Sequence, residues 1–295
     1  MMTVRFWGTR GSIATPGSST IRYGGNTSCV ELRSGNHLIV FDAGTGIRDL
    51  GNRLLKEFKS QPLTIHVFIS HTHWDHIQGF PFFLPAYEPQ NTIHLYGPPG
   101  RDKSLDKILK IQMDSDYFPV ELGAMSPNIF VHEMREDVTI GELTVKHFYL
   151  NHPAMCLAYR VTDGQRSVVY ATDNEPYQGT LFAQSQKSES ASDFPTYLDE
   201  KFVEFLSQTD LYVGEAQYTT EEYNEKRGWG HSPLESVVRF AVQANVKTFA
   251  LFHHDPLHDD NFVDGMIQEA KHLVTLYGGK TECVGAIEGA EIQIP

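Results

Sequence analysis

The sequence has few cysteines and no long apolar run, and each shortage excludes a class of protein. Its 295 residues contain three cysteines, Cys29, Cys156 and Cys283, which are odd in number and far apart. This usage predicts buried, reduced thiols in a cytoplasmic protein, not a disulfide framework. No run approaches the roughly 18 apolar residues that span a bilayer. We interpret residues 1–7 as a first strand, not as a signal peptide.

Cationic side chains are also scarce. Lysine and arginine number 24 against 37 aspartates and glutamates, which gives a formal net charge of −13. Long nucleic acids and anionic membranes bind to clustered cations, so we expect neither as a partner. A small anionic substrate held by a local cation stays compatible with this charge. The share of hydrophobic residues, 40%, is that of a globular protein and excludes a disordered or fibrous chain.

Short apolar runs separated by glycine-rich and polar turns predict strands in both halves of the chain. The strands are expected at residues 4–7, 30–32, 37–42, 64–70, 93–96, 129–133, 143–148, 157–161, 168–171, 211–213 and 248–252. Apolar stripes at helical spacing predict helices over residues 47–58, 104–113, 232–244 and 260–277. We expect two sheets covered by outer helices in one domain over residues 1–295. A polar insertion around residues 180–200, with a surface loop at 184–193, interrupts this pattern.

The segment His71-Thr72-His73-Trp74-Asp75-His76 directly follows the apolar run 64–70. Three imidazoles and a carboxylate in six residues are costly to bury without a partner, and they are preferred ligands of zinc and similar ions. One such cluster does not close a site alone. Further donors stand where later predicted strands end, namely His152, Asp173 and His253.

This set of residues resembles the metallo-β-lactamase superfamily. His71 to His76 matches its HxHxDH motif, and His152, Asp173 and His253 follow in the expected order. The resemblance covers essentially the whole chain. It implies an α/β (α+β) fold, the four-layer αββα sandwich, and a site for two divalent metal ions. Zinc is the first expectation, and manganese and iron accept the same donors.

The resemblance also implies how the ligands are shared between the two metals. The first metal is expected on His71, His73 and His152. The second is expected on Asp75, His76 and His253, with Asp173 bridging both. His254 is the alternative to its neighbour His253, because strand alternation sends the two to opposite faces. Asp42 is interpreted either as the residue that orients a ligand histidine or as a helix cap.

A second motif, Gly230-His231-Ser232-Pro233, precedes the helix predicted at 232–244. Ser232 has the character of an N-cap and Pro233 that of the first helical residue. The motif resembles a segment of ribonuclease Z and related phosphodiesterases, in which the histidine helps to protonate the leaving oxygen. A surface histidine near a helix cap is the alternative interpretation.

These observations predict a dinuclear metal-dependent hydrolase of small phosphodiesters, with 3′,5′-cyclic nucleotides as the first choice. A hydroxide bridging the metals would attack phosphorus, and Asp75 and His231 are the expected catalytic residues. The alternatives are a transfer-RNA 3′-processing endonuclease similar to ribonuclease Z, and a lactone, thioester or sulfate-ester hydrolase. A binding scaffold without metals is a further alternative of another class. A homodimer is expected by analogy. The aromatic residues Trp74, Tyr117 and Phe118, together with Met113, would form either a base-stacking wall or part of the core.

Overall fold

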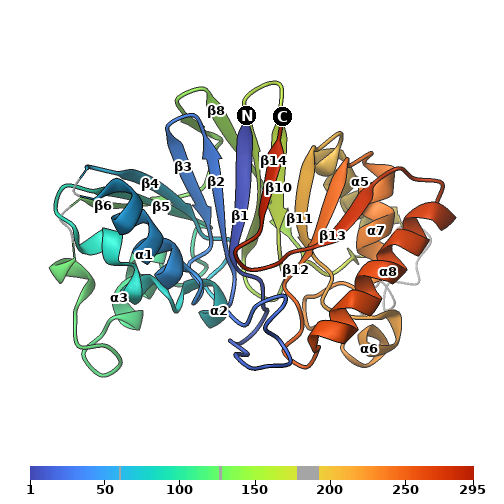
Figure 1. The fold of residues 1–295 in the computed structure, drawn as a ribbon, viewed down its shortest axis with the longest axis horizontal. Coiled ribbons are helices and arrows are strands. Elements are labelled where there is room, and N and C mark those ends of the chain that lie inside the picture. Colours follow the sequence, from blue (N-terminus) through green and yellow to red (C-terminus); the bar gives the residue numbers. More distant parts are fainter. Residues whose placement is uncertain (60, 126–127, 178–192) are drawn as a thin grey trace. The chain divides into compact units, whose positions relative to one another are not determined.

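The computed structural model describes residues 1–59, 61–125, 128–177 and 193–295 (Figure 1). The chain forms two compact units. The first consists of Met1–Gly141 together with Ile287–Pro295, and the second of Glu142–Ala286. The last residues of the chain therefore return to the unit in which the chain begins.

The first unit contains a mixed sheet with the strand order β14-β1-β2-β3-β4-β5-β6. Strands β14, β1, β2 and β3 are antiparallel, whereas β3 to β6 are parallel. Its strands are β1 (Met2–Gly8), β2 (Cys29–Ser34), β3 (His37–Phe41), β4 (Thr64–Phe68), β5 (Thr92–Gly97), β6 (Ile129–Glu133) and β14 (Glu291–Ile294). The short strand β7 (Val138–Ile140) follows at the end of the first stretch of this unit.

One face of this sheet packs against helix α1 (Ile47–Phe58). Leu50 and Leu54 of the helix are fully buried with Ile65 and Val67 of β4, so the apolar stripe of the helix meets alternate residues of the strand. The unit also contains helix α3 (Leu105–Gln112), which contacts β6, and short 3₁₀ turns. The turns are Phe80–Phe82, Leu84–Tyr87 and Leu122–Ala124.

The sheet of the second unit has the order β13-β12-β11-β10-β9-β8. Its strands are β8 (Leu143–Leu150), β9 (Cys156–Thr162), β10 (Ser167–Ala171), β11 (Leu211–Glu215), β12 (Thr248–Phe252) and β13 (Glu282–Gly285). Strands β10 to β13 are parallel, and β9 is antiparallel to both β10 and β8. The carboxyl ends of β8, β10, β11 and β12 consequently lie at the same edge of the sheet.

The second unit has helices α5 (Asp193–Leu206), α6 (Thr220–Glu225), α7 (Leu234–Gln243) and α8 (Asp260–Leu276). Helices α7 and α8 contact each other, and they contact β11 and β13 respectively (Figure 1). Val238 and Ala241 of α7 are fully buried, as its predicted apolar stripe requires. Among the described residues, no helix combines the length and the apolar composition needed to cross a membrane.

The predicted strands and helices are all present, and α1 begins and ends at the predicted residues. One detail is wrong, because Pro233 and not Ser232 is the N-cap of α7. Pro233 has an extended backbone with ψ 144°, and the Ser232 hydroxyl donates instead to the Asn174 carbonyl. The loop predicted at 184–193 falls almost entirely outside the described residues, and α5 begins at Asp193. The single domain over residues 1–295 stays a prediction.

Candidate metal centre

The four predicted ligands of the first unit follow strand β4 and enter the short helix α2 (Trp74–Ile77). His71, Asp75 and His76 are buried, whereas His73 is exposed. The ring centroid of His71 lies 4.5 Å from that of His73 and 4.2 Å from that of His76. Nε2 of His76 lies 3.1 Å from Oδ2 of Asp75. The motif therefore gathers its imidazoles and its carboxylate at one point of the first unit.

Asp42 holds the orientation of this cluster. Its Oδ2 lies 2.7 Å from Nδ1 of His76 and accepts a 2.8 Å hydrogen bond from the Ser70 hydroxyl. Its Oδ1 accepts from the Ser70 backbone N–H at 2.6 Å. An imidazole engaged through Nδ1 keeps Nε2 for a metal, which is how carboxylates orient ligand histidines. The alternative of a helix cap is wrong, because α1 has Gly46 as its N-cap.

In the second unit, the predicted ligands His152, Asp173 and His253 lie at the common edge of β8, β10 and β12. Oδ2 of Asp173 is 3.3 Å from Nε2 of His253, and Oδ1 is 4.0 Å from Nε2 of His152. Asp173 and His253 have φ angles of 54° and 57°. This left-handed conformation is uncommon for residues other than glycine and concentrates at functional sites. These backbone conformations direct the side chains of Asp173 and His253 toward each other.

The adjacent residues His253 and His254 have different contacts. His253 faces Asp173, whereas Nε2 of His254 lies 3.1 Å from the carbonyl oxygen of Ala286. The physical cause differs from the expected strand alternation. Strand β12 ends at Phe252, and the positive φ of His253 sets the direction of its side chain.

His231 joins this group of the second unit. Its Nδ1 lies 3.8 Å from both Oδ1 of Asp173 and Oε2 of Glu215, and its ring stacks on that of His253 at 5.3 Å. The residue is 9% exposed, so the interpretation as a surface histidine is wrong. The loop that precedes it is held by Glu175, whose carboxylate accepts from the backbone N–H groups of Gly228 and Gly230.

Two further residues of this group were not expected from the sequence. Oε1 of Gln217 lies 2.9 Å from Nδ1 of His253. Gln217 therefore contacts His253 through the same ring nitrogen by which Asp42 contacts His76. Glu215 accepts from the backbone N–H groups of Asn174 and Ser232. Burial, and after it the charge of Asp173, raises the pKa of the Glu215 carboxyl to about 8. The sequence feature that could have identified Glu215 is a carboxyl group at the last position of the apolar strand β11.

The donors present fit a divalent metal ion. In the second unit, Asp173, His231 and His253 are buried and offer ligand atoms within 4.8 Å of one another. In the first unit, buried His71, Asp75 and His76 supply the same chemistry. Imidazole nitrogen and carboxylate oxygen suit zinc, manganese and iron alike. In each unit one histidine of these donor sets is already engaged through Nδ1, His76 by Asp42 and His253 by Gln217.

A cavity of about 480 Å³ in the first unit adjoins the His71 to His76 segment. Trp74 and Tyr117 line it and are 81% and 77% exposed. Phe118 lines this cavity and also packs against the core. Met113 is 1% exposed and belongs to the core, which agrees with the alternative interpretation of these residues. Exposed aromatic rings around one cavity are typical of a binding surface.

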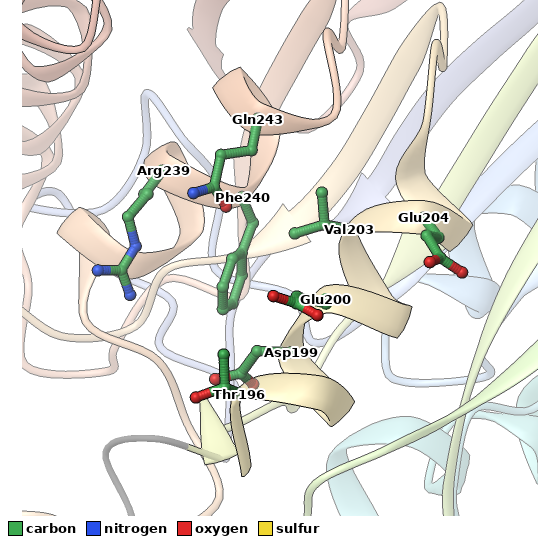
Figure 2. A pocket seen from close by; sticks show the side chains of 8 residues that line it. All are labelled: Thr196, Asp199, Glu200, Val203, Glu204, Arg239, Phe240 and Gln243. Atoms are coloured by element: carbon green, nitrogen blue, oxygen red, sulfur yellow. The ribbon is translucent and has the colours of Figure 1, made fainter. Parts of the chain in front are cut away.

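Another cavity, of about 460 Å³, lies between α5 and α7 of the second unit (Figure 2). It contains none of the predicted site residues. Figure 2 shows the carboxylates Asp199, Glu200 and Glu204 on α5 and the side chain of Arg239 on α7. The α5–α7 cavity is therefore separate from the metal-ligand group of the second unit.

A family model described as the beta-lactamase superfamily domain matches residues 37–254. The chain belongs to the beta-lactamase superfamily. Ribonuclease Z of Brevibacillus brevis is 24% identical over 262 residues, which are 78% of this chain and 79% of the relative. The metallo-β-lactamase fold protein YhfI of Bacillus subtilis has a TM-score of 0.66 at 19% identity and is matched over 99% of this chain and all of its own.

A diphosphatase of the PhnP family gives a TM-score of 0.65 at 15% identity, over 100% of this chain and 98% of its own. These likenesses confirm the predicted fold class, the metallo-β-lactamase fold with two mixed sheets and helices. This beta-lactamase superfamily member is a hydrolase of that fold. None of the relatives described here is named for a 3′,5′-cyclic nucleotide, the first-choice substrate. The alternative prediction, an enzyme similar to ribonuclease Z, does match the name of a relative.

Proposed function

We propose that this chain is a metal-dependent phosphodiesterase and that an RNA phosphodiester is the first substrate to test. The observation that carries the proposal is the buried group Asp173, His231 and His253, in a chain similar to ribonuclease Z. It combines metal donors with a histidine beside two carboxylates. A hydrolase of phosphodiesters needs both, since it must neutralise charge on phosphorus and protonate a leaving oxygen.

On this proposal, the chain binds two divalent ions, zinc first. The proposed ligands are those predicted from the sequence, namely His71, His73, Asp75, His76, His152, Asp173 and His253. When bound, the metals supply an activated water and neutralise the non-bridging oxygens of the substrate. Asp42 and Gln217 orient His76 and His253 through their Nδ1 atoms, so these rings present the opposite nitrogen to a metal.

His231 is the proposed proton donor. As imidazolium it carries a proton on Nδ1, which faces the carboxylates of Asp173 and Glu215. With Nδ1 held toward these acidic groups, Nε2 carries the proton that goes to the leaving alcohol. Glu175 fixes the ring's position by binding the backbone of Gly228 and Gly230.

Two observations favour different classes of substrate. Relatives named ribonuclease Z favour RNA. The net charge of −13 favours a small phosphodiester, because an acidic surface repels a long polyanion. Small diesters such as cyclic nucleotides are therefore the second candidate, and the diphosphatase neighbour makes nucleotide anhydrides a further comparison.

The experiment is a substrate panel on the purified protein with its bound metals measured. It includes a transfer RNA with a 3′ extension, cyclic AMP, a dinucleoside diphosphate and a lactone. We expect phosphodiester cleavage in the presence of Zn²⁺ or Mn²⁺. Rapid turnover of the lactone alone would overturn the proposal, and a protein without stoichiometric metal would favour the binding scaffold.

We further propose that Trp74 and Tyr117 stack on a base of the substrate. Stacking of a base on an aromatic ring contributes about 1–3 kcal/mol. Trp74→Ala should therefore raise KM about 5- to 150-fold for a dinucleotide and leave KM unchanged for the matching abasic diester. An equal change with both substrates would contradict stacking. The cytoplasmic location and the homodimer stay predictions.

A further inference from the structure

Three histidines share one face of the first unit's sheet, outside the metal donors described above. They are His66 on β4, His94 on β5 and His132 on β6. His66 pairs in register with His94, and His132 pairs with Tyr96 two residues further along β5. Their neighbours Ile65 and Ile93 belong to the core on the opposite face. Strand alternation therefore places the three imidazoles together.

The rings are close and mutually oriented. Nδ1 of His94 lies 3.0 Å from Nε2 of His132. The ring of His66 stacks on that of His94, with centroids 5.1 Å apart and planes 11° apart. Nδ1 of His66 lies 3.3 Å from the hydroxyl of Tyr96, which holds the stacked ring in place. All three side chains are partly exposed, so an ion from solvent can reach them.

The distance between the two nitrogens fits chelation. A zinc-sized ion lies about 2.0–2.1 Å from each imidazole nitrogen, so two nitrogens at right-angled or tetrahedral positions are about 2.9–3.4 Å apart. The observed separation falls inside this interval. Burial lowers the pKa of both His94 and His132, which keeps their rings neutral and their lone pairs available at neutral pH.

We propose that His94 and His132 form an additional binding site for one transition-metal ion, with His66 as the residue that positions His94. One of the two rings donates the present hydrogen bond. On metal binding its proton moves to the other nitrogen of that ring, so no proton is released and one hydrogen bond is replaced by two metal–nitrogen bonds. Cu²⁺ binds such nitrogen sites most tightly among the divalent first-row ions, and water completes the coordination.

The experiment uses the full chain already saturated with Zn²⁺ and freed of excess metal. It is titrated with Cu²⁺ as the wild type, as His94→Gln, as His132→Gln, and as the control His272→Gln, which removes an exposed histidine of α8. We expect the wild type and the control to take up one equivalent that both other variants lack. The electron paramagnetic resonance spectrum of this equivalent should show two imidazole nitrogens.

The proposal is overturned if all four proteins take up the same number of equivalents. A second measurement needs no variant. Substoichiometric Cu²⁺ should broaden the imidazole NMR signals of His94 and His132 before those of His272 or the remaining histidines, and broadening of another pair first would also overturn it. Neither readout depends on phosphodiesterase activity, so this proposal and the proposed function can fail separately.

Discussion

The chemistry of the histidines at the candidate site follows from the partner of the second ring nitrogen. His76 has Asp42, His253 has Gln217, and His152 has the carbonyl oxygen of Gly230 at 3.0 Å. A ring held through one nitrogen presents the other in a set direction. His231 differs, because its Nδ1 faces two carboxylates and it is proposed to donate a proton.

The proposed role of His231 predicts a dependence on the leaving group. His231→Ala should lower kcat about 10²- to 10⁴-fold for an RNA or cyclic nucleotide substrate, the usual effect of losing a general acid. With bis(p-nitrophenyl) phosphate the decrease should be much smaller, since p-nitrophenolate leaves without a proton. Steady-state kinetics on both substrates measure this. Equal decreases would exclude the acid role.

His66 predicts a loss of stability in acid. Burial, followed by the charges of the neighbouring histidines, lowers its pKa from 6.5 to about 4. Between these values the unfolded chain binds a proton that the folded chain does not, so the free energy of unfolding falls as the pH falls from about 6.5 to about 4. Above pH 6.5 neither state is protonated, and the effect vanishes.

Urea unfolding across this interval tests the effect. His66→Gln, which can keep the contact with Tyr96, should show a shallower decrease than the wild type. His272→Gln serves as the control, because it removes an exposed histidine of α8. If His66→Gln and the wild type lose stability in parallel, the lowered pKa does not govern this region.

At the scale of elements, the order of strands places the donors. Strands β8, β10, β11 and β12 all end at one edge of the second unit's sheet, and each is followed or closed by an imidazole or carboxyl group of the candidate site. These residues are His152, Asp173, Glu215 and His253. Donors from four separate strands therefore meet because of β-pairing and not because of their spacing in the chain.

Helix α8 offers a test of local stability. The side chain of its N-cap Asp259 accepts a 2.8 Å hydrogen bond from the backbone N–H of Phe262. Asp259→Ala should lower the free energy of unfolding by about 0.5–2 kcal/mol, whereas Asp259→Asn should nearly retain it. Urea denaturation measures both. A loss for asparagine as large as for alanine would show that the charge, and not the cap, stabilises the helix.

At the scale of the whole molecule, metal binding should contribute to folding. Burial and the charge of Asp173 raise the pKa of Glu215, so a second negative charge beside Asp173 is unfavourable without a nearby cation. A ligand that binds only the folded state stabilises it, by about 2.7 kcal/mol at a concentration 100 times its Kd. Chelation should therefore abolish hydrolysis and lower Tm, and Zn²⁺ or Mn²⁺ should restore both.

Scanning calorimetry with metal analysis on the same samples measures this response. Asp173→Asn gives the comparison, since it lacks the charge of the proposed bridging ligand and should respond less to chelation. An unchanged Tm after complete removal of the metals would contradict a structural contribution. The activity assay on the same samples separates loss of metal from loss of fold.

The sequence by itself predicted most of the elements and a set of candidate donors. Apolar periodicity gave the bounds of α1 and located the strands other than β7, β13 and β14, because these elements depend on neighbours along the chain. The density of imidazole and carboxylate groups in His71 to His76 indicated a metal, because ligand chemistry depends on residue type. Only the tertiary structure turned His253 toward Asp173 and His254 toward Ala286, paired Asp42 with His76, brought Glu215 to His231 and Gln217 to His253, and returned β14 to the first unit. These depend on contacts between residues far apart in the chain and on the backbone angles of single turns, which local patterns do not encode.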